Sequence, residues 1–301
     1  MEQFIEKAEV LVEALPYITR FKGNIVIIKY GGSAMLDDKL KESVIKDIVL
    51  LEAVGIQPVI VHGGGSEINI LAEKLGIKSQ FVQGLRITDE QTVEIVEMVL
   101  VGKVNRMIVG MINEFGGKAV GISGKDAGLI TAKKKPPVTV VDESGIEKTV
   151  DLGLVGGIED VNPQIILTLV KEGYIPVIAP TAASRDGTTY NINADTVAGS
   201  IARNIKANKL IILSDQRGIL REMNNEDSLI PRIEIGEIDE LVKTGIIDGG
   251  GIPKIYACKN ALMYGVKEVH IIDGRLKHSL LLEIFTNQGI GTMIYKKEES
   301  S

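Results

Sequence analysis

Short apolar segments alternate with amphipathic segments along most of the chain, and this alternation restricts the fold more than any other feature. Segments such as NIVIIKY (24–30), QPVIVHGGG (57–65) and KLIILSD (209–215) have the length and branched apolar composition of buried strands. Between them lie segments with the spacing of amphipathic helices, for example residues 37–55 and 194–206. We therefore predict a mainly parallel sheet that helices cover on both faces.

Two further helices are predicted in the N-terminal half of the chain. Apolar residues at helical spacing predict an N-terminal amphipathic helix: Phe4, Ile5, Ala8, Leu11, Val12 and Leu15. We expect Pro16 to end this helix, and its apolar stripe to pack on its own domain or on another subunit. Thr88, followed by Asp89 and Glu90, predicts the start of a long helix that reaches about Phe115.

The middle of the chain interrupts the alternation. Residues 119–158 contain short β-like pieces broken by prolines and glycines, which predict hairpins. The alternation resumes near residue 181, so we expect two lobes on one sheet, residues 23–180 and 181–301, preceded by the helix in residues 1–22.

Composition and charge exclude several classes of function. The net charge of -6 and the pI of about 5.3 give no basic excess for nucleic acid or anionic lipid. A single cysteine, Cys258, cannot form an internal disulfide, which fits a reducing compartment. No apolar run approaches the roughly 18 residues of a membrane span, and the acidic N-terminus does not resemble a signal peptide. We expect a soluble, cytoplasmic protein.

Two predicted strands end in glycines, in IIKYGG and VIVHGGG. Ligands of open α/β sheets bind beyond the carboxyl ends of strands, where glycine lets backbone N–H groups approach an anion. Tight-turn packing is the alternative, but two such loops that open into helices favour anion binding. The nucleotide fingerprints G-x-x-x-x-G-K-[ST] and G-x-G-x-x-G do not occur, and neither do the protein-kinase elements H-R-D and D-F-G.

Lys29 stands at the end of the first core strand, where an apolar residue is expected. The glycines that follow leave the space beside its side chain open, so the ammonium group can reach a phosphate there. A lysine whose head extends to solvent is the alternative interpretation.

Five motifs in a fixed order resemble the amino-acid kinase family: VIIKYGGSAM, VIVHGGGSEIN, QGLRIT, YNINADTVAGSIA and DGGGIPKI. Within it they are similar to the branch that phosphorylates the γ-carboxylate of N-acetyl-L-glutamate in arginine synthesis. The resemblance runs from about residue 20 to the C-terminus. It implies an αβα three-layer sandwich around a mainly parallel open sheet, with the acyl amino acid in residues 23–180 and ATP in residues 181–301.

The resemblance also implies roles for single residues. Lys29 and Lys254 would stabilise the migrating phosphoryl group, and Asp195 would lie between them and orient both. The acceptor carboxylate is already ionised, because its reference pKa is about 4.3, so no general base is needed. The expected acceptor-binding residues are Gly64, Gly65, Arg86, Asn191 and Asn193.

On the nucleotide side the resemblance is less complete. The matching positions are Gly31, Gly32, Ser214, Asp215 and Gly218. Gln216 stands where the family usually has an aliphatic residue, and Gly251 where it usually has methionine. Mg²⁺ should arrive with ATP and be held mainly by phosphates and water. Three histidines and one cysteine do not predict a transition-metal cluster.

The C-terminal run HIIDGRLKHSLLLEIFTNQGIGT and the N-terminal helix resemble the arginine-inhibited branch of this family. In that branch these helices join three dimers into a hexamer, and a PII-type signalling protein is a further partner that the resemblance allows. The arginine pocket would be lined by Tyr17, Lys209, His270, Glu283, Gly289 and Gly291. His270 and His278 as a metal pair, or simple packing of a terminal helix, are the alternatives.

Two other functions remain open from the sequence. The same fold could act on another acceptor, namely glutamate, aspartate, carbamate or UMP. The chain could also be an arginine sensor that has lost catalysis, although intact Lys29, Lys254 and Asp195 argue against this.

Overall fold

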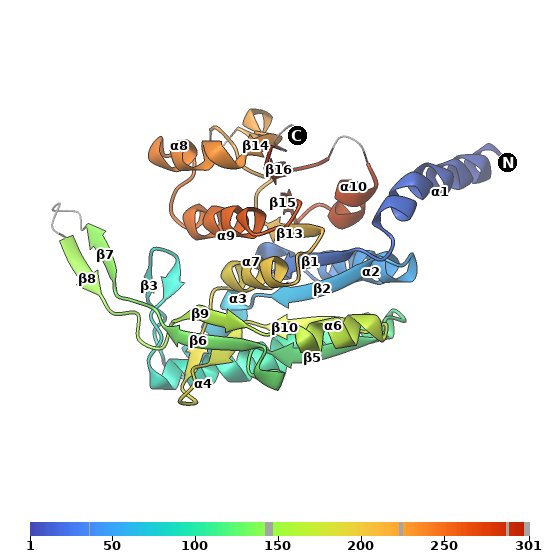
Figure 1. Cartoon of the computed structure of the whole chain (residues 1–301). Helices are drawn as coiled ribbons and strands as arrows, with labels where there is room; N and C mark the ends of the chain where they lie inside the picture. Colours follow the sequence, from blue (N-terminus) through green and yellow to red (C-terminus); the bar gives the residue numbers. More distant parts are fainter. Residues whose placement is uncertain (36, 142–146, 223–224, 287–288, 298–301) are drawn as a thin grey trace.

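The computed structural model describes the chain except for residues 36, 142–146, 223–224, 287–288 and 298–301 (Figure 1). Its centre is an eight-stranded sheet in which every neighbouring pair is parallel except β15 and β16. This confirms the predicted sheet. Its strands are, in spatial order, β14 (Arg232–Glu234), β16 (Thr292–Tyr295), β15 (Glu268–Asp273), β13 (Lys209–Ser214), β1 (Ile25–Tyr30), β2 (Gln57–His62), β10 (Ile175–Ala179) and β5 (Ala119–Ser123).

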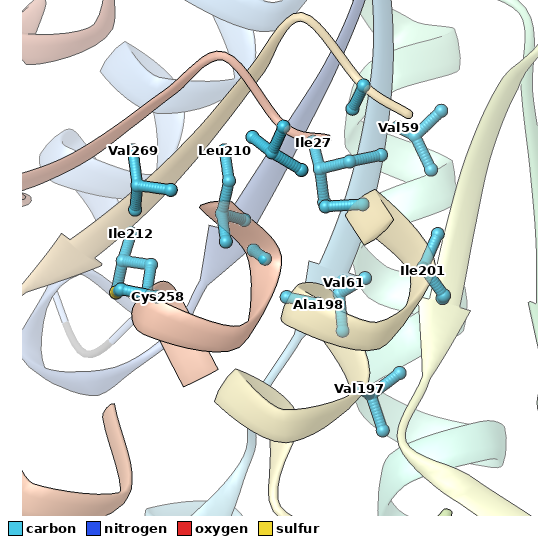
Figure 2. Packing of buried hydrophobic residues seen from close by; sticks show 14 of the residues in the cluster. Ile27, Val59, Val61, Val197, Ala198, Ile201, Leu210, Ile212, Cys258 and Val269 are labelled. Carbon is cyan, nitrogen blue, oxygen red and sulfur yellow. The ribbon is translucent and has the colours of Figure 1, made fainter. Parts of the chain in front are cut away.

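Helices cover both faces of this sheet, so the molecule has three layers. Alternate residues of a strand point to opposite faces. Ile27 and Val61 therefore belong to one apolar cluster, shown in Figure 2, while Ile28 and Ile60 belong to the other. The first face is covered by α6 (Gln164–Lys171), α7 (Ala194–Asn204), α8 (Ile238–Lys243) and α9 (Gly251–Met263), and the second by α2 (Asp38–Ala53), α3 (Gly65–Lys74), α4 (Glu90–Glu97), α5 (Asn105–Glu114) and α10 (Ser279–Phe285).

The predicted hairpins between residues 119 and 158 are confirmed in part: β5 belongs to the central sheet, whereas the later strands of this region form smaller sheets. β6 pairs antiparallel with β9, and β7 pairs antiparallel with β8 in a hairpin that projects from the body (Figure 1). The strands of the smaller sheets are β12 (Thr189–Asn191), β11 (Thr181–Ala183), β6 (Ile130–Lys134) and β9 (Gly156–Val161); β3 (Phe81–Val82) and β4 (Leu85–Arg86); and β7 (Val138–Val141) and β8 (Glu147–Val150).

The N-terminal helix is longer than predicted. Helix α1 spans Glu2–Phe21 and contains Pro16, so the expectation that Pro16 ends it is wrong. A proline inside a helix removes one backbone hydrogen bond. The turn beyond it is held by Phe21, which is buried in the core, and by the bond from the Lys22 N–H to the Ile18 carbonyl. Its first half projects away from the sheet, with Phe4 and Val12 exposed (Figure 1).

The long helix predicted from Thr88 to Phe115 is divided into three parts. Asp89, rather than Thr88, caps α4 by accepting a hydrogen bond from the Thr92 N–H at 2.8 Å. A π-helix, Met98–Val104, then joins α4 to α5. Its wider turn was not predictable from apolar spacing, and it lies beside one of the two glycine loops. The described residues also form short 3₁₀ helices: Gly32–Met35, Asp126–Gly128, Glu226–Ser228 and Ile235–Glu237.

In the part of the chain that the structure describes, no helix is both long and apolar enough to cross a membrane.

Candidate active site

The two glycine loops meet at the carboxyl edge of the central sheet. β1 and β2 are parallel neighbours, with Tyr30 paired to His62 at their ends. The Gly63 N–H donates to the Tyr30 carbonyl at 2.7 Å, and a Cβ on Gly63 would lie 3.7 Å from the Gly31 Cα. The two loops are therefore joined by a backbone hydrogen bond and lie close together.

Lys29 points toward a carboxylate beside these loops. Its Nζ lies 3.0 Å from Asp195 Oδ1, and the two side chains are only 13% and 10% exposed. Asp195 is in the first turn of α7, which Asn193 caps by accepting from the Thr196 N–H at 3.1 Å. The lysine head is thus held at the site by an ion pair, and does not extend to open solvent.

Lys254 approaches the same region from α9. It lies in the first turn of that helix and donates to Ser214 Oγ, at the end of β13, at 3.0 Å. Burial raises the pKa of the Cys258 thiol, the Asp195 carboxylate raises it further, and the Lys254 ammonium lowers it. Both charges therefore act on one buried thiol. Lys254 hydrogen-bonds to Ser214, whereas Asp195 forms its ion pair with Lys29.

A cavity of about 190 Å³ lies beside the Gly63–Gly65 loop. All five residues predicted to bind the acceptor line it: Gly64, Gly65, Arg86, Asn191 and Asn193. Its apolar wall was not predicted from the sequence, because these side chains read as ordinary core residues: Ile68, Leu85, Leu100 and Val155. The cavity combines one guanidinium, backbone N–H groups and an apolar wall, which suits a small carboxylate with an apolar substituent.

Arg86 is held in place before any ligand binds. Its guanidinium donates to Asn69 Oδ1 at 2.7 Å, to the Gly65 carbonyl at 3.1 Å and to Ser79 Oγ at 2.5 Å. The ring of Phe81 lies 4.6 Å from it. Burial lowers the pKa of Arg86, but a guanidinium begins so high that it stays charged. Asn69 and Ser79 gave no signal in the sequence, since the fold alone brings them to Arg86.

A second cavity, of about 350 Å³, lies beyond Lys254. Asp215 lines it, as do Gln216 and Gly251, the two departures from the family pattern. Ser214 faces Lys254, as described above. Gly218 packs tightly against Thr292, where a Cβ would lie 2.5 Å from its Oγ1.

Gly31 and Gly32 complete the predicted nucleotide-binding set. A Cβ on Gly31 would lie 3.3 Å from Lys29 Nζ, and Gly32 has a φ of 69°, which favours glycine. Gly31 therefore keeps the space beside the Lys29 ammonium open, whereas Gly32 provides the backbone conformation of the loop.

A third cavity, of about 270 Å³, lies between the end of α1 and the C-terminal elements. All six residues predicted for an arginine pocket line it: Tyr17, Lys209, His270, Glu283, Gly289 and Gly291. His270 Nδ1 lies 2.5 Å from Glu283 Oε1, and Lys209 is ion-paired with Glu268. The hydrogen bond with His270 holds the pKa of Glu268 well below its usual range, and Lys209 acts in the same direction against the effect of burial.

His270 and His278 do not share a partner. His278 Nδ1 bonds to Asp47 Oδ1 at 2.6 Å, whereas His270 bonds to Glu283. Among the described residues, no group of three or more His, Cys, Asp or Glu side chains could hold a metal ion.

Comparison with known proteins gives matches over nearly the whole chain. The pattern of the amino acid kinase family matches residues 24–273. The acetylglutamate kinase of Heliobacterium modesticaldum is 55% identical over 296 residues, 98% of this chain and 100% of that protein. That of Carboxydothermus hydrogenoformans is 56% identical over 294 residues, 98% of this chain and 99% of that protein.

A solved structure shows the same fold. N-acetylglutamate synthase from Neisseria gonorrhoeae, complexed with coenzyme A and L-arginine, superposes with a TM-score of 0.78 at 25% identity. The match covers 96% of this chain and 65% of the synthase chain, so this chain spans about two thirds of the synthase.

Proposed function

The chain belongs to the amino acid kinase family and, within it, to the acetylglutamate kinases, and on this premise we propose how its residues perform the reaction. Lys29, Lys254 and Asp195 direct the γ-phosphoryl group of ATP onto the γ-carboxylate of N-acetyl-L-glutamate. The observation that carries this assignment is the Lys29–Asp195 ion pair at the meeting point of the two glycine loops.

The two ammonium groups supply the charge that the transfer needs. Phosphoryl transfer leaves little covalent work for the protein, and depends on positioning and on stabilising charge on the moving group. Lys29 extends from β1 beside Gly31, while Lys254 extends from α9 beside the larger cavity. Asp195 orients Lys29 through the ion pair, and it is not a base, because the acceptor carboxylate is already ionised.

The cavity beside the Gly63–Gly65 loop binds the acceptor. Arg86 takes the α-carboxylate with its forked guanidinium, which its contacts with Asn69 and Gly65 hold in position. The N–H groups of Gly64 and Gly65 face the reacting γ-carboxylate, and Asn191 contacts the amide. The apolar wall accommodates the acetyl methyl group.

The second cavity, which Lys254 and Asp215 line, binds ATP. Asp215 and the neighbouring apolar residues Ile219 and Ile247 contact the nucleoside, and Gly31 and Gly32 leave room for the phosphates. Mg²⁺ enters as part of the MgATP substrate. Phosphate oxygens and water supply most of its ligands. ATP as donor, together with the single buried cysteine, favours the cytoplasm as the place of action.

A panel assay tests the acceptor. The protein is incubated with MgATP, hydroxylamine and one acid at a time: N-acetylglutamate, glutamate or aspartate. Hydroxamate with N-acetylglutamate alone is the expected result. Product with free glutamate alone would assign a different acceptor, and no product with any acid would overturn the proposed activity.

The third cavity is proposed to bind L-arginine and inhibit the reaction. Glu283 offers a carboxylate for the guanidinium, and its pKa is lowered overall: burial raises it, but His270, the Ile290 N–H and Lys209 together outweigh this effect. Because Tyr17 and Phe21 of α1 line the same cavity, arginine can act on the position of α1. We expect Glu283→Gln to raise the half-inhibiting concentration of L-arginine roughly 30-fold or more, the cost of losing a buried charge partner. Unchanged inhibition would contradict this assignment.

The exposed half of α1 is proposed to join dimers into a hexamer. Four of its apolar side chains are exposed in the single chain: Phe4, Ile5, Val12 and Leu15. Burying them against the same helix of another copy would remove apolar area from water. Mass measurement in solution tests this: the full chain should be hexameric, and a chain that begins at Phe21 should be smaller and insensitive to arginine. A truncated hexamer that arginine still inhibits would rule the proposal out.

A further inference from the structure

A buried polar network lies directly under the acceptor loop and has no part in the mechanism above. It consists of His62, the last residue of β2, and Asn105, the first residue of α5, both with no exposed surface. His62 Nδ1 lies 2.8 Å from the Gly63 carbonyl oxygen, and His62 Nε2 lies 3.2 Å from Asn105 Nδ2. Buried polar groups are costly unless they are hydrogen-bonded, so this arrangement needs a physical reason.

The network allows only one tautomer of the neutral His62 ring. Asn105 Nδ2 also donates to the Val177 carbonyl at 2.8 Å, and Asn105 Oδ1 accepts from Arg106, which fixes the amide orientation. An amide nitrogen can only donate, so Nε2 of His62 must accept. The ring proton is therefore on Nδ1, and Nδ1 donates to the Gly63 carbonyl.

This bond fixes the direction of the next peptide group. The Gly63 carbonyl and the Gly64 N–H belong to the same planar trans peptide, in which the two point in opposite directions. The carbonyl points at His62, in the core, so the Gly64 N–H points away from the core, toward the cavity that Gly64 lines. Among the described residues, none accepts a hydrogen bond from this N–H.

We propose that His62 is a positioning residue for phosphoryl transfer: its Nδ1–H holds the Gly63–Gly64 peptide so that the Gly64 N–H faces the acceptor carboxylate. Glycine peptides rotate more easily than others, and this loop contains three successive glycines, Gly63 to Gly65. Without the His62 donor the peptide can turn over, which would present a carbonyl oxygen to the reacting carboxylate. The inference rests on the function proposed above.

The π-helix completes this support from below. The Asn105 N–H bonds to the Leu100 carbonyl, five residues back, as a π-turn requires. A Cβ on Gly64 would lie 2.6 Å from Leu100 Cδ2 and 3.3 Å from Val104 Cγ2. Two apolar side chains of the π-helix therefore pack against Gly64 and leave no room for a side chain there. The residue that follows the π-helix is Asn105, which hydrogen-bonds to His62. This irregular turn thus packs against Gly64 directly and is linked to the Gly63 carbonyl through Asn105 and His62.

The ring remains in this state at neutral pH. Burial lowers the pKa of His62 to about 4, the bond to Gly63 opposes this, and the Arg106 guanidinium lowers it further. His62 is accordingly a fixed donor and not a proton carrier, so it should contribute no pH dependence to the rate near neutrality.

Two amide variants separate the donor from the rest of the network. In His62→Asn the side-chain amide lies near the position of Nδ1 and can still donate to Gly63, whereas in His62→Gln it lies near Nε2 and reaches Asn105 instead. Both variants are polar, buried and smaller than histidine, so each controls for the other. We expect His62→Gln to lower kcat/KM for N-acetylglutamate about 10- to 100-fold and to leave the KM for ATP unchanged. This decrease does not exceed the decrease caused by removing one oxyanion donor. His62→Asn should stay within about threefold of wild type.

Nuclear magnetic resonance of the wild-type protein gives a second readout that needs no variant. The account predicts a proton on His62 Nδ1 and a shift of the Gly64 amide signal when N-acetylglutamate binds without ATP. A proton on Nε2, or a Gly64 amide that does not respond to the acceptor, would overturn the inference even if a variant failed to fold. Equal losses in the two variants, or two unaffected variants, would also overturn it. If the wild type yields no hydroxamate with any acid, the proposed function itself fails, and that result is read first.

Discussion

The acceptor cavity beside the Gly63–Gly65 loop and the nucleotide cavity beside Lys254 are built in different ways. On the acceptor side Arg86 is held by three hydrogen bonds and an aromatic ring. On the nucleotide side Lys254 has one described hydrogen bond, to Ser214, and it follows the glycines Gly250 and Gly251. The acceptor half is therefore formed before the substrate binds, while the nucleotide half depends more on its ligand to fix the reacting groups.

The largest expected effect falls on Lys29, whose ion pair with Asp195 lies beside the two glycine loops. Lys29→Met removes the ammonium group beside the transferred phosphoryl group and leaves Asp195 as an unpaired buried carboxylate. We expect kcat to fall about 10²- to 10³-fold, by analogy with the loss of one charge-stabilising donor, with a smaller change in the KM of either substrate. Steady-state kinetics checks this. A variant with kcat within threefold of wild type would remove Lys29 from the chemistry, and the exposed Lys78→Met serves as the matched control.

The acid sensitivity of the acceptor half is the next largest effect. The pKa of His62 is depressed to about 4 in the folded protein from an ordinary value of 6.5, so the folded state resists protonation. Its contribution to stability is present above the ordinary pKa and is lost as the pH falls toward about 4, up to about 3 kcal/mol in all. Urea unfolding at several pH values should show a steeper loss in wild type than in His62→Asn. Parallel curves for the two proteins would contradict the prediction.

Replacing Arg86 by lysine tests preorganisation on the acceptor side. Lysine keeps the charge but loses the fork that binds a carboxylate in two places and donates to Asn69 and Gly65. We expect the KM for N-acetylglutamate to rise about 10-fold, the value of one charge-assisted bond, with the KM for ATP unchanged. Should both KM values rise together, the two cavities would not be the separate units that the comparison describes.

Removing the anchor of Lys254 should have the smallest effect, and it should fall on the other substrate. Ser214→Ala deletes the hydroxyl that accepts from Lys254, and a single hydrogen bond contributes about 1 kcal/mol, or roughly fivefold. The loss should appear in kcat/KM for ATP and leave the KM for N-acetylglutamate unchanged. A loss confined to kcat/KM for N-acetylglutamate would contradict the assignment of Lys254 to the nucleotide side. Thr168→Ala, which removes an exposed hydroxyl in α6, is the control.

The sequence predicted the parts of the site that depend on strand ends. Lys29 and the glycine loops follow directly from where apolar strands stop, because parallel strands bring their carboxyl ends to one edge. The resemblance to a known family then supplied residues that strand patterns cannot identify, such as Arg86 and Asn191, which line one cavity in the structure.

The features that could not be predicted depend on contacts between distant segments. The turn beyond Pro16 continues because Phe21 is buried against the core, and the π-helix at Met98–Val104 has no distinctive apolar spacing. The bond between His62 and Asn105 joins residues 43 positions apart. Local propensity contains no information about such pairs, so only the folded chain shows why the histidine stands before the glycines.

The central claim is that the ammonium groups of Lys29 and Lys254 converge on one phosphoryl group. A crystal structure with MgADP, N-acetylglutamate and an aluminium fluoride mimic of the transferred phosphoryl group tests it most directly. Both Nζ atoms should lie within about 3 Å of oxygen or fluorine atoms of the bound nucleotide and mimic, with Asp195 still beside Lys29. If either lysine pointed into a different cavity, or lay a nucleotide's length from the mimic, the account would be contradicted.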